Sequence, residues 1–274
     1  MRTTRKTALL TLMLAGAIGL AGCTSIEWHI TDTGADTTAG TQTNTQTDAD
    51  GGKKISNELT DDAGTSELDT TWDEATAPDM WLLAGSAQID DACAAALDMG
   101  GGYVAADESG YVAKAALRVT ADTIAYGKRE RADISDTDVR GWPKPNQKAS
   151  VTFASGKTYS GYFWNRSHLI AHMLGGEDAD YNLVTGTRAQ NVGDNSGDGG
   201  MQHCEWRAYN YVCDHEDVYV DYAATPVYND GENIPRAVIV DMKSSDGGLD
   251  ERYIVYNAMP GYTIDYATGE VTAN

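Results

Sequence analysis

Phenylalanine and basic residues are scarce in this chain. It has 2 Phe among 274 residues, and 20 Lys and Arg stand against 41 Asp and Glu, which gives a formal net charge of −21. The aromatic content comes from 15 Tyr and 6 Trp instead, a bias that favours partly exposed strands over a wide apolar core. Collagen, coiled-coil and multi-span membrane classes are excluded. We therefore expect a β-rich α+β domain in an acidic protein.

Residues 1–23 have the pattern of an export signal. A basic start precedes a largely apolar run from Ala8 to Leu20, which is too short to span a bilayer. The small residues before Cys23 resemble a bacterial lipobox, which implies cleavage before Cys23 and diacylation of its thiol. Two acyl chains would anchor the protein durably to a membrane outside the cytoplasm. The alternative is a plain secretory signal with an incidental Cys.

Residues 24–75 are rich in Thr, Asp and Gly and lack apolar periodicity. Such a segment cannot offset its ordering entropy, so we expect an acidic, disordered tether before a folded domain over 76–274. Export would place Cys93, Cys204 and Cys213 in a permissive redox compartment, where an odd count allows one disulfide at most. The lack of a CxxC motif argues against a zinc ribbon.

Residues 139–176, hereafter the basic segment, contain no Asp or Glu although the surrounding domain is acidic. Their charged side chains are Arg140, Lys144, Lys148, Lys157 and Arg166. A solvated basic face would account for a few scattered cations, but 38 consecutive residues without an acid favour an anionic partner.

Apolar spacing predicts the main secondary-structure elements. Helices are expected over 86–99 and around Met201, Cys204, Ala208, Tyr211 and Val212, with Glu205 on the same face as this apolar set. Strands are expected over 157–166, 218–228, 236–245 and 251–260, and His168 follows the first of them at a turn. The sequence shows no TPR, WD or leucine-rich repeat.

Three blocks in order resemble the DNA/RNA non-specific endonuclease family, the His-Me finger or ββα-metal nucleases, in particular its secreted streptococcal-type branch. They are WNRSHLIAHMLGGE at 164–177, NLVTGTRAQNV at 182–192 and YNAMPGYTIDYATGE at 256–270. With weaker similarity from about residue 104, the resemblance covers most of the folded part. It implies an α+β fold in which a mixed or antiparallel central sheet carries a ββα-metal finger.

The resemblance also implies roles for individual residues. The family's D-R-G-H signature falls on residues 165–168, which makes His168 the general base. The metal-binding Asn falls on Asn191, and the helix Glu that holds a metal-bound water falls on Glu205. The implied cofactor is Mg²⁺, with Mn²⁺ or Ca²⁺ as alternatives.

Substrate contacts are expected from four basic residues. Arg166 or Arg188 would clamp a phosphate oxygen, and the sequence does not rank the two. Lys144 and Lys148 of the basic segment complete the set of expected substrate-binding side chains.

Two residues depart from the family pattern. Asn165 stands where the broader signature has an acid, so no charge at this position orients the histidine. His172 has no family role, and its HLIAH context lacks the Glu of a zinc-protease HExxH, so we interpret it as a surface or substrate-side residue.

Two alternative roles stay open for Glu205. It could form a salt bridge with Arg207 or Arg188. It could also be the twelfth residue of an EF-hand calcium loop whose earlier ligands would be Asp194, Ser196 and Asp198, although the segment before this loop lacks helical periodicity.

Taken together, the residues and the resemblance predict an exported, lipid-anchored, metal-dependent endonuclease. It would hydrolyse DNA and RNA with little sequence preference and needs no obligate protein partner. Two alternatives stay open: a calcium-binding surface lipoprotein without catalysis, and a catalytically inactive nucleic-acid receptor.

Overall fold

The computed structural model describes residues 68–105 and 111–274. The predicted signal peptide, the lipidation site at Cys23 and all but the last residues of the predicted tether lie outside these residues. None of the described helices is long and apolar enough to cross a membrane. The elements, in chain order, are β1 Trp81–Gly85, α1 Asp91–Asp98, β2 Gly101–Ala105, β3 Val112–Val119, α2 Ala121–Tyr126, β4 Lys148–Thr152, β5 Thr158–Tyr162, β6 Trp164–His168, η2 His172–Leu174, η3 Asp180–Asn182, β7 Leu183–Thr187, α3 Arg188–Val192, α4 Met201–Asp214, β8 Val220–Val227, β9 Ala237–Ser244, β10 Asp250–Tyr256, β11 Tyr262–Ile264 and β12 Val271–Ala273.

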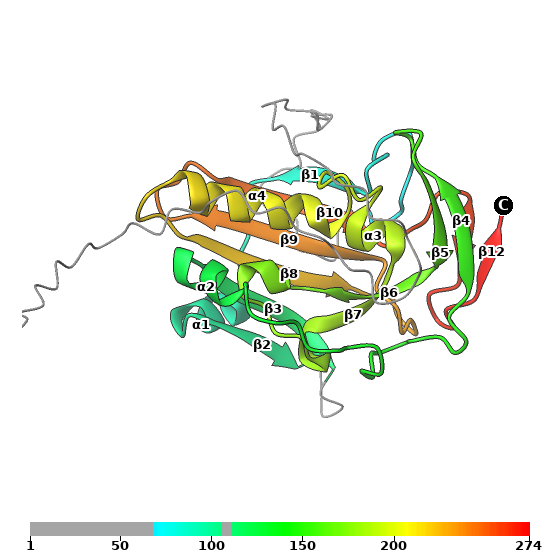
Figure 1. The fold of residues 1–274 in the computed structure, drawn as a ribbon, viewed down its shortest axis with the longest axis horizontal. Helices are drawn as coiled ribbons and strands as arrows, with labels where there is room; N and C mark the ends of the chain where they lie inside the picture. The colour runs from blue at the N-terminus through cyan, green and yellow to red at the C-terminus, as the bar shows by residue number, and fades with distance from the viewer. Residues whose placement is uncertain (1–67, 106–110) are drawn as a thin grey trace, which may run out of the picture.

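A six-stranded sheet in the order β1-β10-β9-β8-β3-β2 forms the centre of the fold (Figure 1). Every neighbouring pair in it is antiparallel. The structure therefore confirms the expected α+β class and, of the two sheet types considered, selects the antiparallel one. The strands expected over 218–228, 236–245 and 251–260 are β8, β9 and β10, and each begins within two residues of its predicted start.

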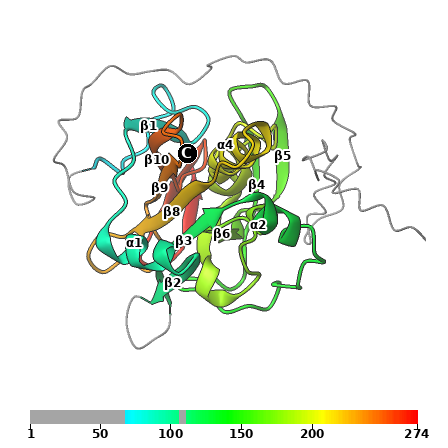
Figure 2. The same ribbon diagram turned by 90° about the vertical axis from the view of Figure 1, so that its left-hand side faces the viewer.

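The sheet separates two apolar layers. Ala115 pairs with Ala224, and both contribute to the main core under α4, whereas the next pair, Ala116 and Ala223, packs against α1. This alternation is expected because successive strand residues point to opposite faces. Figure 2 shows α1 and α4 on the two sides of the sheet.

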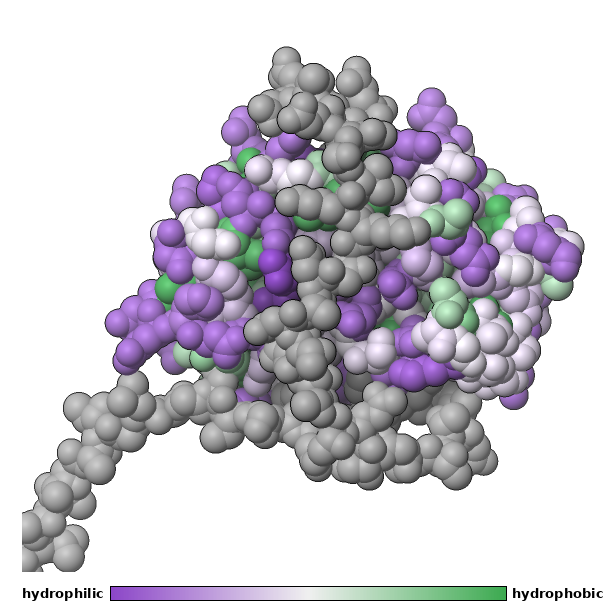
Figure 3. All heavy atoms as spheres, turned by 90° about the horizontal axis from the view of Figure 1, so that it is seen from above, coloured by the Kyte–Doolittle hydropathy of each residue, from purple (hydrophilic) through white to green (hydrophobic). Residues whose placement is uncertain are grey.

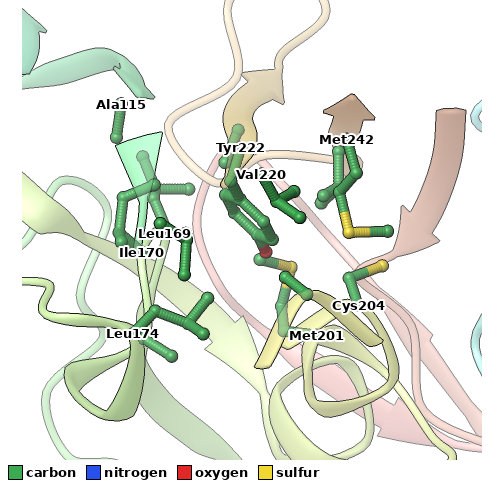
Figure 4. Packing of buried hydrophobic residues seen from close by; sticks show 14 of the residues in the cluster. Ala115, Leu169, Ile170, Leu174, Met201, Cys204, Val220, Tyr222 and Met242 are labelled. Carbon is green, nitrogen blue, oxygen red and sulfur yellow. The ribbon is translucent and has the colours of Figure 1, made fainter. Parts of the chain in front are cut away.

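The main core fills the space between α4 and the sheet. Met201 and Cys204 point from α4 toward Tyr222 and Met242 of the sheet (Figure 4), and all four side chains are fully buried. Cys93 and Cys204 are both buried free thiols, so neither of them pairs with Cys213. Most of the described surface visible in Figure 3 is hydrophilic, and its apolar residues are scattered.

Two predicted elements differ from the structure. The helix expected over 86–99 begins only at Asp91, because the Asp90 side chain accepts from the backbone N–H of Cys93 and caps it there. The strand expected over 157–166 is two strands, β5 and β6, separated by Phe163. Phe163 is fully buried in a second apolar cluster with Trp164 and Met259, and its backbone bonds to residues outside either hairpin.

Candidate active site

A β-hairpin followed by a short helix positions the expected general base and the expected metal-binding asparagine. Strands β6 and β7 are antiparallel, with His168 opposite Leu183 at one end and Trp164 opposite Thr187 at the other. Thr187 caps α3, which carries Asn191 and packs against β6. The arrangement is strand, strand, helix, as expected of a ββα finger (Figure 1).

A buried asparagine attaches this finger to the rest of the fold. The Asn257 amide accepts from the backbone N–H of Thr187 at 2.7 Å and donates to the carbonyls of Thr185 and Pro235. Its side chain is completely buried, so each of these hydrogen bonds replaces one that water would otherwise supply. The finger is therefore held in a defined position beside the central sheet.

His168 lies at the end of β6 with 7% of its surface exposed. Its Nε2 is 2.9 Å from Oδ1 of Asp178, whereas Nδ1 has no hydrogen-bond partner among the described residues. Because a carboxylate only accepts, this contact assigns the proton of a neutral ring to Nε2 and leaves the lone pair on Nδ1. Burial lowers the pKa of His168, partly opposed by the hydrogen bond to Asp178, and the positive charge of Arg131 lowers it further.

Asp178 lies at the candidate site although the sequence did not indicate it. Its side chain is 5% exposed, and besides His168 it accepts from the backbone N–H of Ala132 at 2.9 Å. Burial acts to raise the pKa of Asp178, but the hydrogen bonds from His168 and Ala132 outweigh it and hold the pKa well below its usual range. The carboxylate is therefore ionised and can orient His168.

A buried asparagine fixes the loop that carries Asp178. The Asn182 side chain donates to the carbonyls of Ile170 and Glu177, both at 2.8 Å, and accepts from the Ile170 N–H at 2.9 Å. It thereby ties the turn after β6 to the start of β7. Asp178 lies ten residues beyond His168 in the chain, so only this folded loop brings the two side chains together.

The interpretation of His172 as a surface or substrate-side residue is wrong. The ring is 5% exposed, its Nδ1 lies 2.9 Å from Oδ2 of Asp178, and its Nε2 lies 3.0 Å from the carbonyl oxygen of Arg129. One carboxylate therefore contacts both histidines. His172 supports Asp178 from the interior rather than facing a substrate.

Asn191 is attached to β6 by two side-chain hydrogen bonds. Its Nδ2 donates to Oδ1 of Asn165 at 3.3 Å, and its Oδ1 accepts from the Ser167 hydroxyl at 3.1 Å. Asn165, which stands in place of an acid, thus supports the carboxamide, while the charge that orients His168 comes from Asp178. A carbonyl oxygen has two lone pairs, so Oδ1 of Asn191 keeps one for a further partner.

Glu205 projects from α4 without a hydrogen bond or ion pair to any described residue. Burial raises the pKa of its carboxyl to about 8, and the charge of Arg131 opposes this rise. The alternative salt bridge is not formed: Arg207 pairs with Glu251 instead, and the described part of the chain gives Glu205 no other arginine partner. A buried carboxylate without a hydrogen-bond or ion-pair partner is energetically costly, and a bound cation would compensate its charge.

The oxygen atoms of Asn191 and Glu205 suit a hydrated hard cation. Across residues 68–105 and 111–274, no three or more His, Cys, Asp or Glu side chains form a group that could hold a metal. The acidic side chains of the predicted calcium loop therefore form no such group among the described residues. Asp194 lies 3.7 Å from Lys157, and the side chain of Asp198 is largely exposed near His203. Mg²⁺ keeps several waters and needs few protein oxygens, which Asn191 and the unpaired Glu205 can supply.

The basic residues occupy different environments. Arg166 donates from Nε to the Thr137 carbonyl at 2.7 Å, and its guanidinium lies 4.0 Å from the Trp142 ring centroid. Lys144 and Lys148 are exposed near the start of β4. Arg188 is buried at the start of α3, on the same short helix as Asn191.

Arg131 was not indicated by the sequence, although it lies beside the site. Its Nε is 3.9 Å from Oδ1 of Asp178, and its charge acts on both His168 and Glu205. The side chain is 55% exposed. The long coil between α2 and β4 delivers it, and such a coil has no periodicity from which a position could be predicted.

Known proteins are similar to this chain. A family model described as DNA/RNA non-specific endonuclease matches residues 135–246. A deoxyribonuclease of Streptococcus dysgalactiae subsp. equisimilis is 34% identical over 150 residues, which is 53% of this chain and 45% of that protein. This chain thus matches less than half the length of that deoxyribonuclease.

Two solved structures are similar to this chain. The structure of Sda1 nuclease with bound zinc ion is 31% identical with a TM-score of 0.67, and the match covers 74% of this chain and 100% of that one. NucA from Streptococcus agalactiae, solved with magnesium ion bound, is 24% identical with a TM-score of 0.49, covering 64% of this chain and 79% of that one. On the sequence of the finger, its fold and the full-length match to Sda1 nuclease, this chain belongs to the DNA/RNA non-specific endonuclease family.

Proposed function

We propose that this protein is a divalent-metal-dependent endonuclease that hydrolyses phosphodiester bonds of DNA and RNA with little sequence preference. The observation that carries the proposal is the histidine at the end of the finger, held through Nε2 by an ionised carboxylate with Nδ1 left unpaired. This is the arrangement a general base requires. Its lowered pKa keeps the ring neutral and able to accept a proton near pH 7.

The proposed reaction is an in-line hydrolysis. Nδ1 of His168 takes a proton from a water molecule as the water oxygen forms a bond to phosphorus, and the bond to the departing sugar oxygen breaks. The new positive charge on the ring lies 2.9 Å from Asp178, which stabilises it. Arg131, with the predicted phosphate contacts Arg166 and Arg188, supplies cations near the site.

The metal would be held by Oδ1 of Asn191, with Glu205 accepting hydrogen bonds from its water shell. When bound, it would neutralise charge on the pentacovalent phosphorus and the leaving oxygen. Sda1 nuclease, solved with a bound zinc ion, supports a divalent cation, and we propose Mg²⁺ because the protein offers so few ligands.

Purified protein tests the proposal directly. With Mg²⁺ it should degrade both supercoiled plasmid and single-stranded RNA, and a chelator should stop both reactions. A protein that binds plasmid but leaves it intact with Mg²⁺, Mn²⁺ and Ca²⁺ would instead be a catalytically inactive nucleic-acid receptor.

We also propose export and anchoring through Cys23. If this is correct, the protein made in a bacterial host should fractionate with membranes and carry acyl chains, and Cys23→Ser should release it into the soluble extracytoplasmic fraction. Soluble protein without the substitution would favour the plain secretory signal.

A further inference from the structure

His172 lies behind the proposed general base and shares its carboxylate. The Oδ1 atom of Asp178 lies 2.9 Å from Nε2 of His168, and Oδ2 lies 2.9 Å from Nδ1 of His172. The three side chains are each at most 8% exposed. One buried carboxylate is therefore placed between two imidazole rings, of which only His168 has a step in the proposed reaction.

Both ring nitrogens of His172 face oxygen atoms that can only accept. Nε2 lies 3.0 Å from the carbonyl oxygen of Arg129, and Nδ1 lies against the carboxylate of Asp178. A neutral imidazole has one N–H and one lone pair, so either tautomer would set a lone pair against an oxygen atom. The contact at Nδ1 is close but is not aligned as a hydrogen bond, which leaves charge as the source of its attraction. Only a ring that carries both protons satisfies the two contacts.

The charged groups on the neighbouring elements do not replace Asp178 as the partner of His172. Helices α2 and α4 pack against η2, which carries His172. Asp122 of α2 is exposed, and Glu205 of α4 lies where the charge of Arg131 reaches it. The other ion pairs of α4 are His203 with Asp198 and Arg207 with Glu251. Among the described residues, Asp178 is therefore the one anion in contact with His172.

A positive charge on His172 changes what Asp178 can offer to His168. Arg131 already lies 3.9 Å from Oδ1 of Asp178, so a second cation at Oδ2 leaves less of the carboxylate's charge to stabilise a protonated His168. We propose that His172 is a positioning residue for the cleavage reaction: it carries both ring protons, holds Oδ2 of Asp178, and so keeps His168 neutral and active at lower pH. Burial is the main cause of the lowered pKa of His168, and the charges of Arg131 and His172 act in the same direction. This inference rests on the proposed nuclease function.

The pH dependence of plasmid cleavage tests this role, because it separates charge from mechanical support. In His172→Asn the amide Nδ2 can take the place of ring Nδ1 and donate to Asp178, but it carries no charge. With one positive charge removed beside Asp178, the acid limb of kcat/KM should move to higher pH by about one unit. Loss of support alone would loosen the contact between Asp178 and His168 and move the limb to lower pH, which is the direction expected of Asp178→Asn.

A matched variant and a spectroscopic measurement make the test specific. His215→Asn is the control, since His215 is an exposed histidine just after α4 whose Nδ1 contacts the Tyr211 carbonyl, and it should leave the acid limb in place. The second measurement examines the ring itself and needs no variant to fold. In ¹⁵N NMR spectra of the unsubstituted protein near neutral pH, both ring nitrogens of His172 should have the chemical shifts of protonated nitrogen. The His168 ring should show one protonated and one unprotonated nitrogen.

The outcomes separate the two proposals. An acid limb that stays in place or moves to lower pH in a folded His172→Asn protein would overturn the role of His172 and leave the nuclease function intact. An unprotonated nitrogen in the His172 ring of the unsubstituted protein would overturn it as well. If the unsubstituted protein did not cleave plasmid, the nuclease function would fail and the positioning role with it.

Discussion

Replacing Asp178 by asparagine is the sharpest test of the proposed general base. The substitution keeps the size of the side chain and removes its charge, so the shape of the loop need not change. In the structure this carboxylate accepts from His168 Nε2 at 2.9 Å in an environment where only 5% of the side chain is exposed. The site therefore loses the partner that fixes the ring and stabilises its protonated form.

The expected loss follows from that geometry. A buried, charge-assisted hydrogen bond contributes about 1.5–3 kcal/mol, and about 1.4 kcal/mol corresponds to a tenfold change in rate. Because the ring becomes cationic as the proton is transferred, most of this energy is lost in the transition state. We expect kcat to fall by about 10- to 100-fold, and further if the new amide donates to Nε2 and reverses the tautomer.

A pH profile distinguishes this role from a structural one. The neutral ring is the active form, so kcat/KM should fall as pH drops through the pKa of His168, which burial holds below its ordinary value. Asp178 raises that pKa, and its loss should shift the acid limb of the profile to lower pH. Asp180→Asn, an exposed position two residues further on, is the matched control. An unmoved acid limb in a folded Asp178→Asn protein, with kcat within about threefold of normal, would refute our assignment.

Four further results are expected. His168→Ala should lower plasmid cleavage by several orders of magnitude while preserving the thermal midpoint to within a few degrees, and a variant that retains activity would remove His168 from the mechanism. Asn191→Ala should do likewise through lost metal, seen as a weakened Mg²⁺ isotherm in calorimetry. In metal-free protein, Glu205 ionises with a raised pKa of about 8, so the free energy of unfolding is highest below its unfolded pKa of about 4.5 and falls as pH rises through 8. The decline should be on the order of 5 kcal/mol and absent in Glu205→Gln, as measured by urea denaturation at several pH values. Finally, cleavage of plasmid should decrease steeply with added salt, because an acidic protein depends on a few local cations to bind phosphate, and salt-insensitive cleavage would exclude that dependence.

The spacing of apolar residues predicted the helices and strands that bury a regular apolar face. The apolar spacing from Met201 to Val212 places one face of α4 on the sheet, and the alternating runs of β8, β9 and β10 lie where they were expected. The start of α1 and the break at Phe163 were missed. The start of α1 depends on the capping side chain of Asp90, and the break between β5 and β6 depends on the buried ring of Phe163. The apolar periodicity of the neighbouring residues reveals neither.

The sequence by itself determined the family, the α+β class and three candidate site positions, His168, Asn191 and Glu205, because these lie within ordered blocks whose residue types and spacing are specific. Only the tertiary structure decided what surrounds them. Asp178 reaches His168 through a loop closed by Asn182, and no periodic pattern encodes a contact that depends on where a loop returns. His172 could likewise be recognised as an interior support only after the fold had buried it, since burial is a property of the surroundings and not of the residue.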